Sequence, residues 1–417
     1  MTRDIIDQVV GGDNLMRDFA AICDTGGRFA GSDSEQKARD YLSNRLEEMT
    51  GTAPTHSPVD YLGWSRGGAV LERLDSTGAL LPCVSLVRSP KTPADGLVAE
   101  LVDIGRGSEQ DFAARASEID GRIVMVRHEY MFATGTIHRR RKYQWAMDRG
   151  AVGFLIACHL PGAGPVTGSS GATPERGIPA VGISAETAEA LSAGGPARIR
   201  LILGAAEAPR RTVNLILDLP GIGPEWVVLS AHIDGHHLAE SAIDNATGLA
   251  AVLAVAAAMA PNMRRFVRGL RIALFNVEEW ALTGSKIYVD GLNDAERSAI
   301  KLNLNLDSIA GSPNLTALTS EFPKLEEWLL AHAREHGHAL DAYRPIMANS
   351  DHYNFARHGI PAARLVAGFD EPESEIKFVL TSGDTRHKVA AEELRRAAGL
   401  TAALIVEACQ AGDLDLR

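Results

Sequence analysis

The chain has 417 residues, 45% of them hydrophobic and 23% charged, which excludes a fibrous or wholly disordered protein and suffices for two or three hydrophobic cores. Its 53 Asp and Glu residues outnumber its 42 Lys and Arg residues, and the net charge of −11 disfavours nucleic acid as a partner because like charges repel. Four cysteines without Cys-x-x-Cys spacing indicate reduced thiols.

Two acidic residues near the start, Asp4 and Asp7, interrupt the apolar stretch that a secretory signal needs. We find no run of about 20 apolar residues that would predict a membrane-spanning helix. We therefore expect a cytoplasmic protein that contacts no membrane.

Residues 5–48 have helical apolar spacing and predict two helices. The second helix is expected to begin at Ser32, which forms a capping box pattern with Glu35. From about Tyr61 the pattern changes to short β-like runs, and residues 97–102 are one of the clearer examples.

Residues 80–202 have the pattern of a smaller α/β module. Residues 121–126 and 151–156 predict buried strands, and residues 142–149 predict a helix that ends at Gly150. The segments on either side look like halves of one larger unit. We therefore expect an insert at 80–205 within a catalytic domain formed by 1–79 and 206–417.

After Arg210 strands and helices alternate. The predicted strands are 226–230, 270–277 and 300–306, and an alanine-rich helix at 246–259 lies between the first two. This βαβ alternation predicts a largely parallel sheet that helices cover on both faces.

Metal-binding residue types follow each of these strands. His232 follows the first, Glu279 the second and Asp307 the third, and Asp244 lies just before the alanine-rich helix. Because the carboxyl ends of parallel strands meet at one edge of a sheet, we expect these side chains to converge. One imidazole and several carboxylates predict one or two divalent metal ions, with zinc or manganese preferred and cobalt as a further candidate.

The neighbouring residues suggest how such a site would work. Asp244 is the candidate for a carboxylate that bridges two ions, and Glu278 is the candidate for acid–base catalysis. A metal ion lowers the pKa of a water molecule that it binds, so Glu278 could take the proton and pass it to a leaving nitrogen. Asp234, two residues after His232, is placed to accept the second N–H of the imidazole and fix its tautomer.

Several blocks of the second half stand in an order that is typical of one family. They are Ala-His-Ile-Asp at 231–234, Ile-Asp-Asn-Ala-Thr-Gly at 243–248, Val-Glu-Glu-Trp at 277–280 with Thr-Gly-Ser at 283–285, then Asp307, Ser-Asp-His at 350–352 and Gly-Ile-Pro at 359–361. With these blocks the chain resembles the co-catalytic metallopeptidases of family twenty-eight, which include bacterial leucyl aminopeptidases and glutamate carboxypeptidases. The resemblance implies an α/β, zinc-peptidase-like core with a mostly parallel mixed sheet flanked by helices.

The insert resembles the smaller α/β protease-associated domain that several members carry, with Arg-Gly-Ala-Val-Gly at 149–153 as its most recognisable stretch. In such relatives the insert lies near the active-site cleft. The resemblance therefore makes the basic run Arg139, Arg140, Arg141 and Lys142 a candidate for binding an anionic substrate group, and a solvated helix face is the alternative.

One position departs from the family pattern. The family places a last metal-binding histidine before a threonine, whereas Leu380 precedes Thr381 here. Leucine cannot bind an ion, so either His352 or His387 replaces the histidine, or a single ion is bound. His352 could equally contact the substrate or have a structural role.

Two further residues have open interpretations. Arg364 could clamp a substrate carboxylate or pair with a structural carboxylate. Tyr353 could donate to an oxyanion or pack. His236 and His237 are interpreted as loop residues.

The leading hypothesis is a metal-dependent hydrolase that cleaves an amide or other C–N bond of a small-molecule or short-peptide substrate, of aminopeptidase or carboxypeptidase type. The alternative is an aminohydrolase that removes an amino group from a non-peptide metabolite such as an aryl amine, using one ion, which Leu380 favours. A third hypothesis is a binding protein that lost catalysis, and Glu278 beside Glu279 argues against it. A homo-oligomer is an open question at this point.

Overall fold

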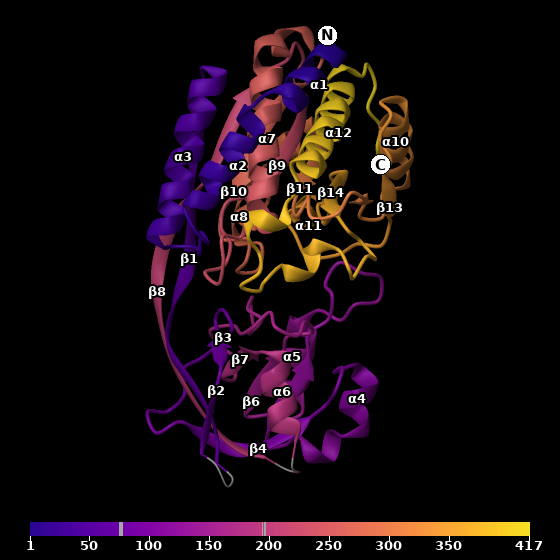
Figure 1. Ribbon diagram of the computed structural model, residues 1–417. Helices are drawn as coiled ribbons and strands as arrows, with labels where there is room; N and C mark the ends of the chain where they lie inside the picture. Colours follow the sequence, from indigo (N-terminus) through magenta and orange to yellow (C-terminus); the bar gives the residue numbers. More distant parts are fainter. Residues whose placement is uncertain (75–77, 194, 196) are drawn as a thin grey trace. The chain divides into compact units, whose positions relative to one another are not determined.

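The computed structural model describes residues 1–74, 78–193, 195 and 197–417, and these divide into two units (Figure 1). The first unit comprises Met1–Tyr61, Arg211–Val379 and Asp384–Arg417, and the second comprises Leu62–Arg210 and Leu380–Gly383. The insert expected at 80–205 falls within the second unit. Its expected ends differ from the unit boundaries because β1 (Thr55–Arg73) and β8 (Arg198–Leu219) are long strands with residues in both units.

The first unit contains a mixed and mostly parallel sheet, as predicted. Its strands follow the order β13 (Asp341–Tyr343), β12 (Leu315–Leu318), β14 (Ala362–Ala367), β11 (Ile300–Leu306), β9 (Trp226–His232), β10 (Gly269–Phe275) and β8. β9 runs parallel to β10 and β11, and β11 runs parallel to β14. The strands predicted at 226–230, 270–277 and 300–306 are confirmed as β9, β10 and β11.

Helices pack on this sheet. The alanine-rich helix α7 (Thr247–Met259) contacts β9 and β11, and on its other sides it contacts α1 (Thr2–Gly11), α2 (Asn14–Asp24), α3 (Asp33–Thr50) and α12 (Ala391–Gln410). Figure 1 shows α1, α2, α7 and α12 gathered beside the strands. The other helices of the unit are α8 (Thr283–Gly291), α9 (Asp294–Ala299), α10 (Pro323–Glu335) and α11 (His352–Ala356).

Contrary to the expectation from the sequence, the helical stretch Ala242–Arg265 is long and apolar enough to cross a membrane by length and composition alone. In the structure 89% of its most apolar window is buried inside the protein. Small alanine side chains let α7 approach the sheet and its neighbouring helices closely, and this burial is typical of a core helix.

The N-terminal segment differs from the expectation, because it forms three helices and not two. The break lies at Gly12, where the backbone is extended, and glycine is a poor helix former. Ser32 caps α3, with its side chain accepting the N–H of Glu35 at 3.2 Å. The reciprocal half of the predicted capping box is not formed, because the main-chain N–H of Ser32 donates to the main-chain oxygen of Phe29 at 2.9 Å. The Glu35 carboxylate accepts a hydrogen bond from Asn276 at 2.7 Å, and thereby ties α3 to the end of β10.

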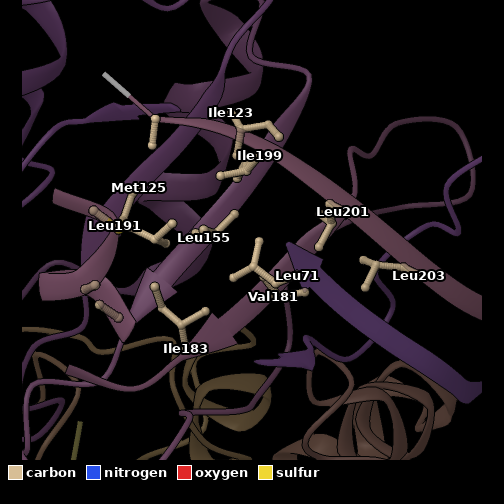
Figure 2. Close-up of a cluster of buried hydrophobic side chains, with 13 residues drawn as sticks. Leu71, Ile123, Met125, Leu155, Val181, Ile183, Leu191, Ile199, Leu201 and Leu203 are labelled. Atoms are coloured by element: carbon tan, nitrogen blue, oxygen red, sulfur yellow. The ribbon is translucent and has the colours of Figure 1, made fainter. Parts of the chain in front are cut away.

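The second unit has its own sheet and core. Its strands follow the order β8, β4 (Leu97–Asp103), β5 (Ile123–Arg127), β6 (Gly153–Ala157), β7 (Ala180–Ile183) and β3 (Cys83–Ser85), and β2 (Ala79–Leu81) pairs with β1. Its helices are α4 (Glu109–Ala114), α5 (Arg139–Asp148) and α6 (Ala185–Ser192). Figure 2 shows the apolar side chains of β5, β6 and β7 packed together with Leu191 of α6.

Candidate metal centre

The carboxyl ends of β9, β10 and β11 bring the predicted site residues to one edge of the first unit's sheet. His232 is the last residue of β9, and Asp307 directly follows β11. Asp244 lies in the short irregular turn Ala242–Ala246 that precedes α7. Among the described residues, ligand atoms of His232, Asp244 and Asp307 lie within 4.8 Å of one another and could hold a metal ion.

The imidazole of His232 is oriented toward the two carboxylates. Its Nδ1 lies 2.8 Å from the main-chain oxygen of Asp234, and because a carbonyl oxygen only accepts, Nδ1 carries a proton. Nε2 therefore faces Oδ1 of Asp244 at 2.9 Å and Oδ1 of Asp307 at 3.6 Å. Buried acceptor atoms this close repel each other unless a cation lies between them, so the three side chains fit a divalent ion with nitrogen and oxygen ligands.

When no metal ion is bound, a proton on His232 can supply the positive charge between these side chains. Burial lowers the pKa of His232, but the charge of Glu278 and the hydrogen bonds with Asp244 and Asp307 outweigh burial and raise this pKa well above its usual value. The carboxylates therefore favour a positive charge at Nε2 from any source.

The Asp234 carboxylate has a different partner from the predicted one. It lies 4.0 Å from Nδ1 of His232, which is too far for a hydrogen bond, because the main-chain oxygen of Asp234 already takes that position. Its two oxygens accept the main-chain N–H groups of Glu278 at 2.9 Å and Glu279 at 3.2 Å. Asp234 thus holds the imidazole through its main chain and the two glutamates through its carboxylate.

Glu278 is buried beside the three-residue group. Burial raises the pKa of its carboxyl well above the usual value, and although the charge of His232 opposes this, the charges of Asp351, Glu279 and Asp307 reinforce it. A raised pKa is what a carboxyl needs to hold and release a proton near neutral pH. Glu279 follows at the same edge but lies outside the three-residue group, so its role as a ligand stays a prediction.

Asp307 is held by donors on both oxygens. Ser350 Oγ donates to Oδ2 at 2.5 Å, and the Arg364 guanidinium lies 3.1 Å from Oδ1. Burial alone would raise the pKa of Asp307, but the charge of Arg364 and the hydrogen bonds from His232 and Ser350 hold it well below its usual range. Of the two roles left open for Arg364, the structure shows a pairing with a carboxylate of the protein.

The two histidines considered as replacements for the missing ligand differ in burial. His352 is fully buried on α11, and burial together with the charge of Arg364 lowers its pKa to about 3, so the ring is neutral. His387 has an exposed side chain on the short turn Arg386–Lys388. In the part of the chain that the structure describes, neither histidine belongs to the group of His232, Asp244 and Asp307.

No sequence pattern predicted a role for Arg28, whose side chain is fully buried. Its guanidinium donates to the main-chain oxygens of Ile233 at 2.9 Å, Glu240 at 2.8 Å and Ser241 at 2.6 Å. These residues belong to the loop between His232 and Asp244, so Arg28 ties that loop to the N-terminal segment. The available signal was an arginine directly after two glycines, between two predicted helices.

Asp384 was missed as well. Its buried carboxylate accepts the main-chain N–H groups of Ile243 at 2.7 Å and Asp244 at 3.4 Å and so fixes the turn that carries Asp244. Burial and the charge of Asp244 raise its pKa to about 7. The signal in the sequence was its place in the late block after Thr381, in which only a histidine was expected to have a role.

Two residues of the basic run belong to the internal structure of the second unit. Lys142 is fully buried, and its Nζ donates to Glu129 at 2.6 Å. Arg139 is also buried, and its Nε donates to the main-chain oxygen of Ser169 at 2.7 Å. These two side chains therefore do not form a solvated helix face, whereas Arg141 is exposed.

Comparison with known proteins places these features in a family. Residues 214–405 match peptidase family M28, and residues 85–191 match the PA domain. The chain is 26% identical over 342 residues to Aminopeptidase YwaD from Bacillus subtilis, a match that covers 80% of this chain and 72% of that protein. Residues 214–405 thus identify this part of the chain as a region of peptidase family M28. The resemblance found in the sequence and the protease-associated insert are thereby confirmed.

Other known proteins are similar to the chain in sequence or in fold. Leucine aminopeptidase 2 from Trichophyton equinum is 27% identical over 310 residues, which cover 73% of this chain and 59% of that protein, so the chain spans only part of the fungal relative's length. The Shewanella amazonensis Peptidase M28 precursor has the same fold, with a TM-score of 0.83 and 22% identity over 100% of this chain and 97% of that chain. BSAP, a zinc aminopeptidase from Bacillus subtilis, aligns with a TM-score of 0.73 and 23% identity over 96% of each chain.

With this M28 region, the chain is a hydrolase of the metallopeptidase class, which confirms the leading hypothesis at that level. The cytoplasmic location and the question of a homo-oligomer stay predictions.

Proposed function

We propose that this M28 chain is an aminopeptidase that removes the N-terminal residue of short peptides with the help of a divalent metal ion, zinc first. The observation that carries the proposal is the convergence of His232, Asp244 and Asp307 beside the buried carboxyl of Glu278. The names of the similar proteins, Aminopeptidase YwaD and Leucine aminopeptidase 2, support the aminopeptidase type over the carboxypeptidase type.

The charge of the site also supports an aminopeptidase. Carboxylates outnumber cations among its buried side chains. The cations are Arg28 and Arg364, and the carboxylates are Asp234, Asp244, Glu278, Asp307, Asp351 and Asp384. Both arginines are already engaged, Arg28 with main-chain oxygens and Arg364 with Asp307. An acidic, poorly solvated site favours the protonated amino group of a peptide and disfavours a terminal carboxylate.

The residues have complementary roles in the proposed reaction. When bound, the metal ion supplies a Lewis acid that polarises the scissile carbonyl and makes water a better nucleophile. The Glu278 carboxylate takes a proton from the attacking water and delivers it to the leaving nitrogen. Asp234 holds the main chain of Glu278 in position for both transfers. The Nδ1–H of His232 donates to the main-chain oxygen of Asp234, and this hydrogen bond keeps the ring in one tautomer. Nε2 is therefore available to the ion.

We infer further that one ion is bound by His232, Asp244 and Asp307. Support comes from Leu380, which offers no ligand atom where the family has a histidine, and from the position of Glu279 outside the three-residue group. Metal analysis of protein that is dialysed against zinc tests this inference, with about one equivalent per chain expected and two equivalents contradicting it.

The test of the activity compares free and blocked peptides. Purified protein is freed of metal, reloaded with zinc, manganese or cobalt, and incubated with short peptides and with the same peptides acetylated at the amino end. We expect release of the N-terminal residue from free peptides, restored by metal, and loss of activity on acetylated ones. Equal cleavage of both forms would contradict an aminopeptidase.

The aminohydrolase remains the second candidate because Leu380 favours a single ion. The same preparations are incubated with aryl amines and small amides, and free ammonia is measured. Ammonia release without peptide cleavage would replace the aminopeptidase proposal with this alternative.

A further inference from the structure

The Asp307 carboxylate accepts from neutral donors and from one charged donor. Ser308 Oγ donates to Oδ1 at 3.1 Å. On one side Ser350 Oγ donates to Oδ2 at 2.5 Å. On the other side the Arg364 guanidinium lies 3.1 Å from Oδ1, and both side chains of this ion pair are only 3% exposed. Oδ1 is also the oxygen that faces Nε2 of His232, so the charged donor and a metal ion would share it.

The neutral donor Ser350 is fixed by a buried chain of hydrogen bonds. Asn305 on β11 donates to Ser350 Oγ at 2.7 Å, and Ser230 on β9 donates to Asn305 at 2.7 Å. Because Ser350 Oγ already accepts from Asn305, its own proton is directed to Asp307. These hydrogen bonds therefore fix the rotation of the Asp307 carboxylate without adding a charge.

The charged donor is fixed by the main chain. Arg364 on β14 is paired in register with Asn305 on β11, and its Nε and Nη2 both donate to the main-chain oxygen of Asp307 at 3.3 Å. Its Nη1 donates to the main-chain oxygen of Asn349 at 3.4 Å. The guanidinium is thus held beside the ligand carboxylate and is not available as a mobile clamp for a substrate.

We propose that Arg364 is a positioning residue that weakens the metal site, because its guanidinium competes with the ion for Oδ1 of Asp307. Two positive charges that share one buried oxygen repel each other, and low solvent exposure leaves this repulsion poorly screened. The competition keeps the ion exchangeable, while Ser350 supplies the orientation that the ligand needs. The inference depends on the metal site of the proposed function and not on the identity of the substrate.

The test measures zinc affinity of the full chain, without substrate, by competition with a chromogenic chelator. Arg364→Met and Arg364→Gln remove the charge, and we expect each to bind zinc about tenfold more tightly than the wild type. Arg364→Lys keeps the charge and is expected to bind as the wild type does. Ser350→Ala removes only the orienting hydrogen bond and is expected to bind about tenfold more weakly.

A purely structural role for Arg364 predicts that all four variants bind zinc more weakly, and that result would overturn the proposal. Unchanged affinity in Arg364→Met and Arg364→Gln would also overturn it. If Arg364→Met does not fold, Arg364→Gln, which retains hydrogen-bond donors, still decides the question. Zinc binding as described without any peptide hydrolysis would contradict the proposed function and leave this inference intact.

Discussion

Asp234 serves the site with two different parts of the same residue. Its main-chain oxygen accepts the ring Nδ1–H of His232, and its carboxylate accepts the main-chain N–H groups of Glu278 and Glu279. The spacing of two residues after His232 predicted a contact, but it could not tell which oxygen makes it. That choice depends on how the peptide group turns after β9 ends, which is a property of the folded loop.

Glu278→Gln tests the acid–base role at the residue scale. The amide cannot take up a proton, so we expect kcat on a cleavable peptide to fall by about 10² to 10⁴. The side chain keeps its shape, and zinc content measured by atomic emission is therefore expected to stay the same. Glu327→Gln makes the same chemical change at an exposed position on α10 and is expected to leave kcat unaltered. Wild-type turnover in Glu278→Gln with full metal content would exclude Glu278 as the base.

At the scale of elements, the N-terminal segment at 26–30 packs against the loop that carries the ligands. Phe29 forms a parallel β-bridge with Gly235, and the N–H of Gly235 donates to the main-chain oxygen of Arg28 at 3.1 Å. Gly27 makes the close approach achievable, because a Cβ at this position would lie 2.0 Å from the main-chain oxygen of His236. The geometry of the loop between His232 and Asp244 thus depends on residues about 200 positions away in the chain.

Gly27→Ala tests this dependence. The added methyl group must push the segment and the loop apart, so we expect zinc affinity to fall by about 10- to 100-fold and the free energy of unfolding to fall by about 1–3 kcal/mol. Chelator competition and urea unfolding measure the two effects. Gly11→Ala is the matched control, because a Cβ there has no neighbour within 4 Å. Equal zinc affinity in both variants would show that the segment does not position the ligands.

The elements that carry the ligands were predictable in different degrees. The apolar runs of β9, β10 and β11 are strong local signals, and the carboxyl ends of parallel strands are expected to meet. The break at Gly12 and the tie of Asp384 to Ile243 were not predicted. The break at Gly12 depends on weak local helix signals on either side of it. The contact between Asp384 and Ile243 joins segments that only the fold brings together.

At the scale of the whole molecule, a bound metal ion is expected to stabilise the first unit. A ligand that binds only the native state adds about 2.7 kcal/mol when its free concentration is about 100 times Kd. Thermal unfolding followed by circular dichroism, with zinc and after chelation, measures the shift, and we expect a lower Tm without the ion. In His232→Ala the two curves are expected to coincide. A chelator effect of the same size in that variant would mean that the ion binds elsewhere.

The second unit is expected to lose stability in acid through His128, which is buried, and His138, which is partly buried. Burial and the charge of Arg139 lower the pKa of His128 well below its usual value of 6.5, and burial and Arg140 do the same for His138. The unfolded chain takes up these protons below pH 6.5 while the folded chain does not, so the free energy of unfolding falls as the pH drops below that value. Each histidine can lower the free energy of unfolding by at most about 1.4 kcal/mol per pH unit.

Urea unfolding at a series of pH values above and below the usual histidine pKa measures how the free energy of unfolding changes. The double variant His128→Gln with His138→Asn removes both titrating rings, and asparagine can still cap α5 as His138 does. We expect its stability to depend less on pH than that of the wild type. His387→Gln alters an exposed histidine of the first unit and serves as the control. An unchanged pH dependence in the double variant would contradict the assignment.

The sequence by itself determined the class of the fold and most of the chemistry, because strand periodicity and residue type at strand ends are local properties. His232, Asp244 and Asp307 could be named from their positions after strands and before a helix, and the structure brings them within 4.8 Å. The tertiary structure alone decided how these ligands are held, through Arg28, Asp384, Ser350 and Arg364. Those contacts join distant segments and depend on the direction of single main-chain and side-chain groups, which no local pattern encodes.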